Sequence, residues 1–290
     1  MCLLFPTHEY AQACIDFLTS YCSSRTLYDQ EKCYIAAFGF YMSHLATKPD
    51  TYLFAAIIPE ALREQSLIFW RLTGLGISSR LAEACLTLLP RRLSPPYEHT
   101  EVPQHSRGRW HNHTIAHDKI RIRLADLNNR TGSRPKSSTP VRKDDIFLYQ
   151  TGMAAIYHTH QLLLQVRGTK TVVFGFPYEL TLKLVQSYGP AWEFWGLGTD
   201  DELDQFEASL KLDSTGSQVQ SVWCECASNP LLRTVDLARI HRLGDQYNFF
   251  VVVDDTIGSV ANVDVLDVAD IVVTSLTKSF SGYANVMAGR

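Results

Sequence analysis

The sequence predicts an α/β protein whose second half is a mostly parallel β-sheet covered by helices. Short, β-branched apolar runs alternate there with segments of helical periodicity, as in repeated strand–helix units. The runs are apolar nearly throughout rather than at every second position, which is typical of strands buried on both faces. The predicted strands are residues 171–176, 191–195, 220–225, 248–254 and 270–275.

Four segments that flank these strands are predicted to be amphipathic helices. Gly189 and Gly244 stand where two of them should end, because glycine readily adopts the left-handed conformation that closes a helix. The four segments read MAAIYHTHQLLLQVR, ELTLKLVQSYG, ELDQFEASLKL and TVDLARIHRLGDQY.

The amino-acid composition changes twice along the chain and so divides it into three regions. Residues 1–90 form a helical or mixed N-terminal extension, in which Ser78 and Ser79 are candidate N-caps of a helix that ends at Pro90. Residues 91–143 are polar, basic and rich in Pro, Gly and Ser, which predicts a linker with at most a short helix at 120–128. Residues 144–290 form the α/β domain.

The amino-acid composition narrows the classes of molecule that this protein is expected to bind. The 27 basic and 30 acidic residues leave a net charge of −3, which argues against nucleic acid and anionic membranes as partners. Seven cysteines without framework spacing, and an N-terminus unlike a signal peptide, predict a reducing, cytoplasmic location. The most apolar stretches are shorter than the roughly 20 residues that span a bilayer. We therefore expect small molecules or proteins as partners.

Polar side chains follow several predicted strands at the point where each strand ends. Ligands of such sheets bind beyond the carboxyl ends of the strands, so these side chains are the first candidates for a site. Asp254 follows one strand, and Glu225 and Asn229 follow another. Lys278 comes after the last strand, among several hydroxyls, and Gly152 opens the first predicted helix.

Lys278 is the residue whose surroundings indicate a catalytic role. A lone lysine is usually a solvated surface residue. Between Ser275, Thr277 and Ser279, after a buried strand, we expect its ammonium to be partly desolvated, which lowers its pKa and makes the amine a nucleophile for carbonyl groups. This is the chemistry of a Schiff base.

The neighbouring groups complement such a lysine. The backbone N–H groups of Gly152 and Met153 open a helix, where a phosphate binds and where glycine allows a close approach. Asp254 offers a carboxylate that can keep a pyridine nitrogen protonated through a charge-assisted hydrogen bond of about 1.5–3 kcal/mol. Phosphate cradle, carboxylate and amine together predict a site for pyridoxal 5'-phosphate.

Several stretches of the sequence carry a family resemblance. VVVDDTIGSV followed by ADIVVTSLTKSFSG resembles the signature of the cystathionine γ-synthase and γ-lyase group, the Cys/Met-metabolism enzymes of the type I pyridoxal-phosphate fold. FLYQTGMAAIY, VVFGFPYELTLKLVQSYGP and ECASNPLLRTVDL resemble the fungal cystathionine γ-synthases more specifically, and TGLGISSRLAEACLTLL resembles their long N-terminal extension. The clear match covers about residues 144–290.

The resemblance implies roles for particular residues. Lys278 would carry the cofactor as a Schiff base and move protons, and Asp254 would pair with the pyridinium nitrogen. Tyr178 would stack on the cofactor ring, and Asn229 would contact the ring hydroxyl, with Glu225 matching a glutamate of the family nearby. The phosphate would be held by Gly152, Met153, Ser275 and Thr277.

The resemblance also implies a reaction, namely γ-replacement on an O-acylated homoserine by cysteine, which yields cystathionine. It implies a homo-oligomer, and a C-terminal domain that follows the last strand in the family and that this chain is expected to lack. A cofactor-binding or assembly partner without turnover, paired with a full-length relative, is the alternative.

Other interpretations of single residues remain. Without the family, Tyr178 reads as a partly buried core tyrosine, and Glu225 and Asn229 as a capping turn before Pro230. A zinc or interaction module could centre on the three imidazoles of HNHTIAH, which are His111, His113 and His117, but the loop-like composition and the absence of nearby cysteines favour a solvated linker and no metal. Cys224 and Cys226 are predicted to be packed core thiols.

Overall fold

The computed structural model describes residues 1–23, 33–40, 51–88, 114–130, 139–212, 219–283 and 285–290. The chain divides into two compact units, Met1–His113 and Thr114–Arg290. The boundary falls within the segment predicted as a linker. Among the described residues, no helix combines the length and the apolar character needed to cross a membrane.

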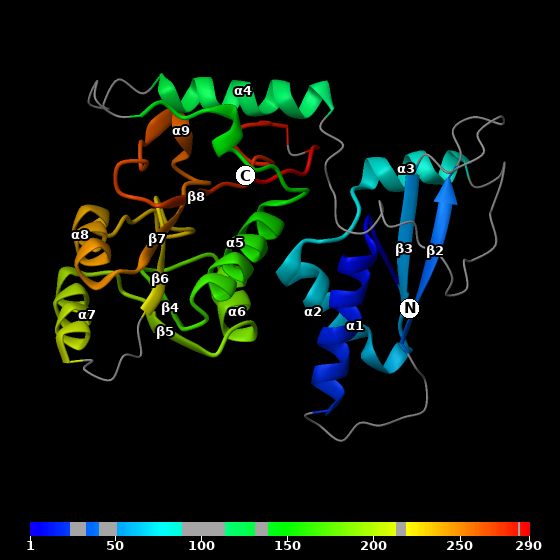
Figure 1. Ribbon diagram of the computed structural model, residues 1–290, viewed down its shortest axis with the longest axis horizontal. Coiled ribbons are helices and arrows are strands. Elements are labelled where there is room, and N and C mark those ends of the chain that lie inside the picture. The colour runs from blue at the N-terminus through cyan, green and yellow to red at the C-terminus, as the bar shows by residue number, and fades with distance from the viewer. Residues whose placement is uncertain (24–32, 41–50, 89–113, 131–138, 213–218, 284) are drawn as a thin grey trace. The chain divides into compact units, whose positions relative to one another are not determined.

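The first unit is a three-stranded antiparallel sheet with helices (Figure 1). The strand order is β1-β3-β2, and α1 packs beside β3. Phe69 of α2 is fully buried and lies edge-on to Phe5 of β1. Ser78 accepts a hydrogen bond from the backbone N–H of Leu81, which confirms it as the cap of α3. The elements are β1 (Cys2–Phe5), α1 (His8–Ser23), β2 (Tyr34–Phe40), β3 (Thr51–Ile57), η1 (Glu60–Leu62), α2 (Arg63–Thr73) and α3 (Ser79–Leu88).

The second unit contains a five-stranded, wholly parallel sheet in the order β5-β4-β6-β7-β8. The predicted fold class is therefore confirmed. The helices are α4 (Ile115–Asn129), η3 (Lys143–Asp145), α5 (Gly152–Val166), α6 (Glu179–Ser187), α7 (Asp200–Leu212), α8 (Leu237–Tyr247) and α9 (Ser259–Asn262). The strands are β4 (Lys170–Phe174), β5 (Ala191–Trp195), β6 (Val219–Glu225), β7 (Phe250–Asp254) and β8 (Ile271–Val273).

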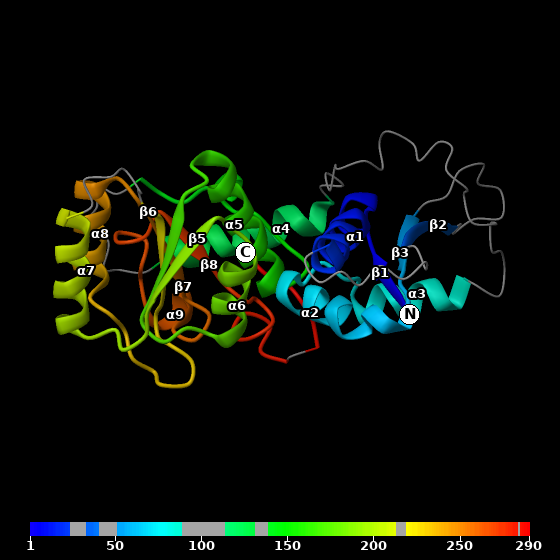
Figure 2. The ribbon, with the colours of Figure 1, turned by 90° about the horizontal axis from the view of Figure 1, so that it is seen from below.

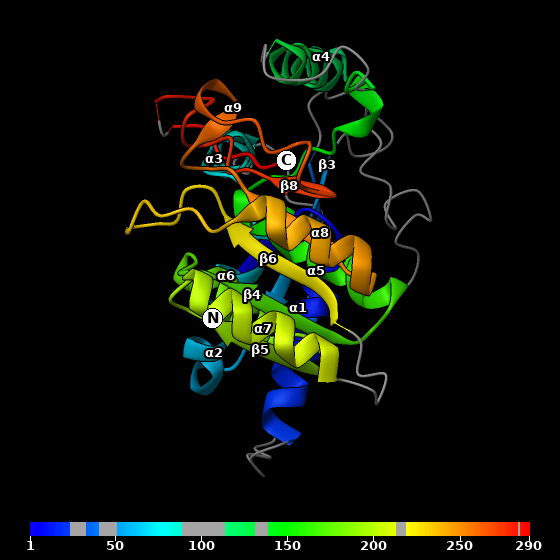
Figure 3. The ribbon, with the colours of Figure 1, turned by 90° about the vertical axis from the view of Figure 1, so that its left-hand side faces the viewer.

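Helices cover both faces of this sheet. Figures 1 and 2 show α5 and α6 on one face and α7 and α8 on the other, and Figure 3 looks onto the α7–α8 side. The larger apolar core lies between the sheet and α7 and α8, where Phe206 and Ile240 are fully buried against Val222 and Val251. This burial on both faces explains why the central strands are apolar at successive positions.

The last described residues return to the sheet edge. The backbone of Arg290 exchanges two hydrogen bonds of 3.0 Å with Thr274, and Gly289 bridges both Tyr149 and Ser275. A Cβ on Gly289 would lie 2.2 Å from the backbone oxygen of Thr151, so only glycine fits there. This close approach joins the start of α5 to the segment after β8.

Three predicted details are wrong. β5 is the sheet edge, and its side chains are half-exposed or exposed rather than buried on both faces. Gly244 lies inside α8, where a Cβ would sit 3.0 Å from the oxygen of Phe249; the left-handed residue that ends the helix is Asn248. The helix of the linker region is longer than predicted, since α4 begins at Ile115 and is capped by Thr114. Pro90 lies outside the described residues.

Candidate active site

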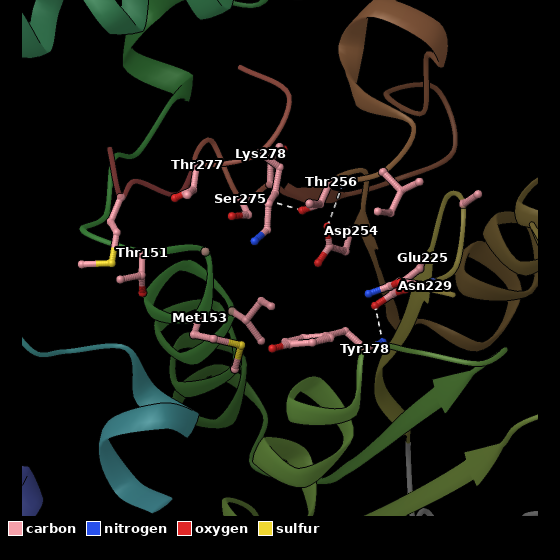
Figure 4. A pocket seen from close by; sticks show the side chains of 16 residues that line it. Thr151, Met153, Tyr178, Glu225, Asn229, Asp254, Thr256, Ser275, Thr277 and Lys278 are labelled. Carbon is pink, nitrogen blue, oxygen red and sulfur yellow. Dashed lines mark hydrogen bonds between the residues drawn. The ribbon is translucent and has the colours of Figure 1, made fainter. Parts of the chain in front are cut away.

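A cavity of about 320 Å³ lies at the carboxyl ends of β6, β7 and β8, beside the start of α5 (Figure 4). This volume falls within the range of small-molecule sites. Every predicted site residue lines it, although they come from segments more than a hundred positions apart. They are Gly152, Met153, Tyr178, Asn229, Asp254, Ser275, Thr277 and Lys278.

The start of α5 forms one wall. Thr151 has an extended backbone, and its hydroxyl accepts a hydrogen bond of 2.9 Å from the N–H of Ala154, so it is the N-cap. Gly152 follows and lies against Ser275, because a Cβ built on Gly152 would be 2.7 Å from the Cβ of Ser275. The N–H groups of a helix start, in a cavity that the hydroxyls of Ser275 and Thr277 also line, are suited to an anion such as phosphate.

Asp254 ends β7 and points into the cavity (Figure 4). Burial raises the pKa of its carboxyl group to about 6; hydrogen bonds from the hydroxyl and the N–H of Thr256 oppose the rise, and the charge of Asp255 adds to it. The N–H bond measures 2.8 Å. A carboxylate that is desolvated in this way gains from a cationic partner, which a protonated pyridine nitrogen would supply.

Asp255 does not line the cavity, and its negative charge is paired with a cationic side chain elsewhere. It is 2% exposed and forms an ion pair of 3.0 Å with Arg290, and it also accepts a hydrogen bond from the Thr274 hydroxyl. Because this charge already has its partner, Asp254 remains the carboxylate available to a ligand.

Lys278 lies in the turn after β8, and its side chain extends toward the cavity (Figure 4). Its predicted partial desolvation is wrong, because the residue is exposed. The physical reason is that β8 stops at Val273, so the lysine comes five residues beyond the strand on a turn at the rim. The N–H of Lys278 donates to the oxygen of Ser275, which fixes this turn.

Tyr178, Glu225 and Asn229 form the opposite wall. The side chain of Tyr178, the residue before α6, lines the cavity and is 41% exposed. Glu225 ends β6, is 9% exposed and accepts hydrogen bonds from the backbone N–H groups of both Tyr178 and Asn229. Burial raises its pKa to about 7.

Sequence reasoning missed Thr256 as a site residue. Its hydroxyl accepts a hydrogen bond of 2.8 Å from the N–H of Ser275, so it connects Asp254 to the rim that carries Ser275 and Thr277. The available signal was its position two residues after the end of a strand. Ile156, Ile257 and Met287, which give the cavity its apolar surface, carry no local signal.

The histidine hypothesis gains no support from the described residues. His111 and His113 lie outside them, and His117 is hydrogen-bonded to the hydroxyl of Thr114 at 2.8 Å. Within the described part of the chain, no cluster of His, Cys, Asp or Glu could hold a metal ion. Cys224 and Cys226 are buried in the main core, as predicted.

Fold and site together define an α/β protein with a cavity at the carboxyl ends of its parallel strands, where a helix start, a buried carboxylate and an amine converge. Residues 142–290 match the family of Cys/Met metabolism PLP-dependent enzymes, and residues 1–78 match the N-terminal domain of fungal trans-sulfuration enzymes. The chain belongs to this family of pyridoxal-phosphate enzymes, which act on amino acids. The resemblance and the cofactor predicted from the sequence are confirmed.

Individual relatives differ in the activities they are named for. The chain is 43% identical over 245 residues to an alanine racemase of Aspergillus violaceofuscus, covering 82% of this chain and 42% of that protein. It is 32% identical over 344 residues to a cystathionine gamma-synthase-like enzyme of Amanita muscaria, covering 99% of this chain and 55% of that one. The chain thus spans about half the length of these relatives. A solved cystathionine gamma synthase from Xanthomonas oryzae pv. oryzae is 24% identical, with a TM-score of 0.45 over 61% of this chain and 41% of that one.

Replacing Gly152 by alanine tests the phosphate cradle. The added Cβ would lie 2.7 Å from the Cβ of Ser275 and force the helix start and the rim apart. We expect the affinity for pyridoxal 5'-phosphate to fall by about tenfold or more, as for the loss of one charge-assisted hydrogen bond. A fluorescence-quenching titration measures it.

The matched control is Gly196→Ala, where the three atoms nearest to the added Cβ all belong to the ring of Phe194, outside the cavity. Unchanged affinity in Gly152→Ala would contradict a phosphate site at this position.

Proposed function

We propose that this chain binds pyridoxal 5'-phosphate at Lys278 and catalyses γ-replacement on an O-acylated homoserine by cysteine, releasing the carboxylic acid and forming cystathionine. The observation that carries the proposal is the convergence of Lys278, Asp254 and the start of α5 on one cavity. Relatives named cystathionine gamma-synthase in Neurospora crassa and Saccharomyces cerevisiae, 45% and 39% identical over 164 and 165 residues, support the choice of reaction.

Each residue of the cavity would have a separate role in this reaction. The cofactor, when bound, withdraws electrons from the substrate Cα and stores the charge that develops there. Asp254 would hold a proton on the pyridine nitrogen, and Gly152, Met153, Ser275 and Thr277 would hold the phosphate. Tyr178 would pack against the ring, and Asn229 would contact its hydroxyl. Lys278 would anchor the cofactor, and its Nζ would take the protons from Cα and Cβ of the substrate, so that the carboxylate leaves from Cγ and the sulfur of cysteine takes its place.

Lys278 suits a proton carrier because of its place. It lies on a turn at the rim rather than within a strand, and its exposed side chain lines the cavity. Positioning of this kind contributes through proximity to the substrate proton, in addition to the acid–base effect itself.

A second candidate is racemisation of alanine or a similar amino acid. The similarity to the Aspergillus violaceofuscus alanine racemase, which extends over 82% of this chain, favours it. Both reactions begin with removal of the α-proton, so Lys278 and Asp254 would have the same roles in each. They differ in whether a group is lost from Cγ.

Product analysis separates the two. The purified chain, loaded with pyridoxal 5'-phosphate, is incubated in D₂O with either O-acetyl- or O-succinyl-L-homoserine plus L-cysteine, or with L-alanine alone. We expect cystathionine that carries deuterium in its homoserine-derived part. The Lys278→Ala variant should form no product. D-alanine as the main product would favour the racemase. Bound cofactor without any product would favour the assembly-partner alternative and overturn the proposed function.

A further inference from the structure

Glu225 joins two separate segments of the pocket wall. Its Oε1 accepts a hydrogen bond of 2.5 Å from the backbone N–H of Tyr178, and its Oε2 accepts one of 3.0 Å from the backbone N–H of Asn229. Tyr178 precedes α6, and Asn229 lies in the loop after β6, so the two donors come from elements 47 and 4 positions away from Glu225. Figure 4 shows the three residues together on one wall.

Only an ionised carboxylate accepts both bonds well. A carboxylate offers two accepting oxygens, whereas a protonated acid or a glutamine places a donor where one acceptor is needed. A backbone N–H facing that donor loses its partner, which is costly at a buried position such as this one, where Glu225 is 9% exposed.

We propose that Glu225 is a positioning residue of the cofactor pocket. Its carboxylate fixes the backbone at Tyr178 and Asn229, so that their side chains are correctly placed in the cavity relative to Asp254. Tyr178 and Asn229 project into the cavity from the backbone groups that Glu225 fixes. The inference rests on cofactor binding in this cavity and is independent of which reaction follows.

The charge environment makes this link sensitive to pH. Burial and the charge of Asp254 raise the pKa of Glu225 to about 7, and the two backbone N–H groups oppose that rise. Protonation of Glu225 close to neutral pH therefore leaves its carboxyl group unable to accept both hydrogen bonds. The titratable and charged groups that border Glu225 are Asp254 on β7, Lys278 across the cavity, Tyr178 itself, Arg233 in the following loop, and the neighbouring Cys224 and Cys226.

Hydrogen exchange of the cofactor-free chain tests the positioning directly. We expect Glu225→Gln to lower the protection of the Tyr178 or Asn229 amide by about tenfold or more, the loss of a hydrogen bond to a charged group. The Thr256 amide, bound to Asp254, should keep its protection and so reports that the fold is intact. In the wild type, protection of the Tyr178 and Asn229 amides should fall between pH 8 and pH 6, and in Glu225→Gln it should not. The matched control is Glu193→Gln, which breaks an ion pair with Lys170 outside the cavity.

A double-mutant cycle on cofactor affinity provides the second readout. If Glu225 acts through Tyr178, the weakening of pyridoxal 5'-phosphate binding by Glu225→Gln should largely vanish in a Tyr178→Ala background, since coupled residues are not additive. Equal weakening in both backgrounds, or unchanged protection at both amides, would overturn the proposal. Neither readout requires turnover, so a failure of the proposed reaction leaves this test unaffected.

Discussion

Replacement of Lys278 by alanine is expected to lower turnover by about 10²–10⁴-fold or more, because it removes the group proposed to move protons at the substrate. It should also eliminate covalent attachment of the cofactor. Non-covalent binding should remain, since Asp254 and the start of α5 lie on other elements of the cavity. Steady-state assays and the visible absorption of the loaded protein measure the two effects.

Lys183→Ala is the matched control for this prediction. Lys183 is an exposed lysine of α6 that pairs only with Glu179 on the same helix, among the contacts described. It should leave both turnover and absorption unchanged. Wild-type turnover in Lys278→Ala would refute the proposed role of this lysine.

Replacement of Asp254 by asparagine is expected to stabilise the cofactor-free protein at pH 8 while weakening cofactor binding. The pKa of Asp254 is raised from 3.8 to about 6, so its ionised form costs stability in the folded state. That cost is absent below the unfolded pKa and appears in full as the pH rises above the folded one. At pH 8 the gain of Asp254→Asn should be on the order of 2–3 kcal/mol, from 1.36 kcal/mol per pKa unit.

The gain should shrink as the pH falls from 7 toward 4, because the wild-type carboxyl then becomes neutral too. The asparagine oxygen can still accept the N–H of Thr256, so that bond does not confound the comparison. Cofactor affinity should drop by about 10–100-fold with loss of the charge-assisted bond. Urea unfolding at several pH values and cofactor titration measure the two quantities.

Asp236→Asn serves as the matched control, because Asp236 is the N-cap of α8 and asparagine caps helices equally well. A gain of stability in Asp254→Asn that is the same at pH 4 and pH 8 would contradict the pKa assigned to Asp254.

The location of the site could be predicted from the sequence because the carboxyl ends of parallel strands share one edge of the sheet. Asp254 and Glu225 are each the last residue of a strand, and β6 pairs with β7 so that these two residues are register partners. The start of α5 was predicted at Gly152, and the observed helix begins there, with Thr151 as its N-cap.

Other features depend on long-range arrangement and have no local signal. β5 has the apolar composition of a buried strand, yet its exposure follows from its place at the sheet edge, which only the strand order determines. Gly244 resembles a helix terminator, but its role is the close approach of Phe249 to α8. The two amides that meet at Glu225 are fixed by the tertiary fold, because Tyr178 is 47 positions away.

Reduction with borohydride followed by peptide mapping tests the central claim most directly. The purified chain is mixed with pyridoxal 5'-phosphate, reduced, digested and analysed by mass spectrometry, beside Lys278→Ala. A reduced pyridoxyl group on the peptide that contains Lys278, absent from the variant, is the result we predict. Labelling confined to other lysines of a folded chain would contradict the assignment of this cavity as the cofactor site.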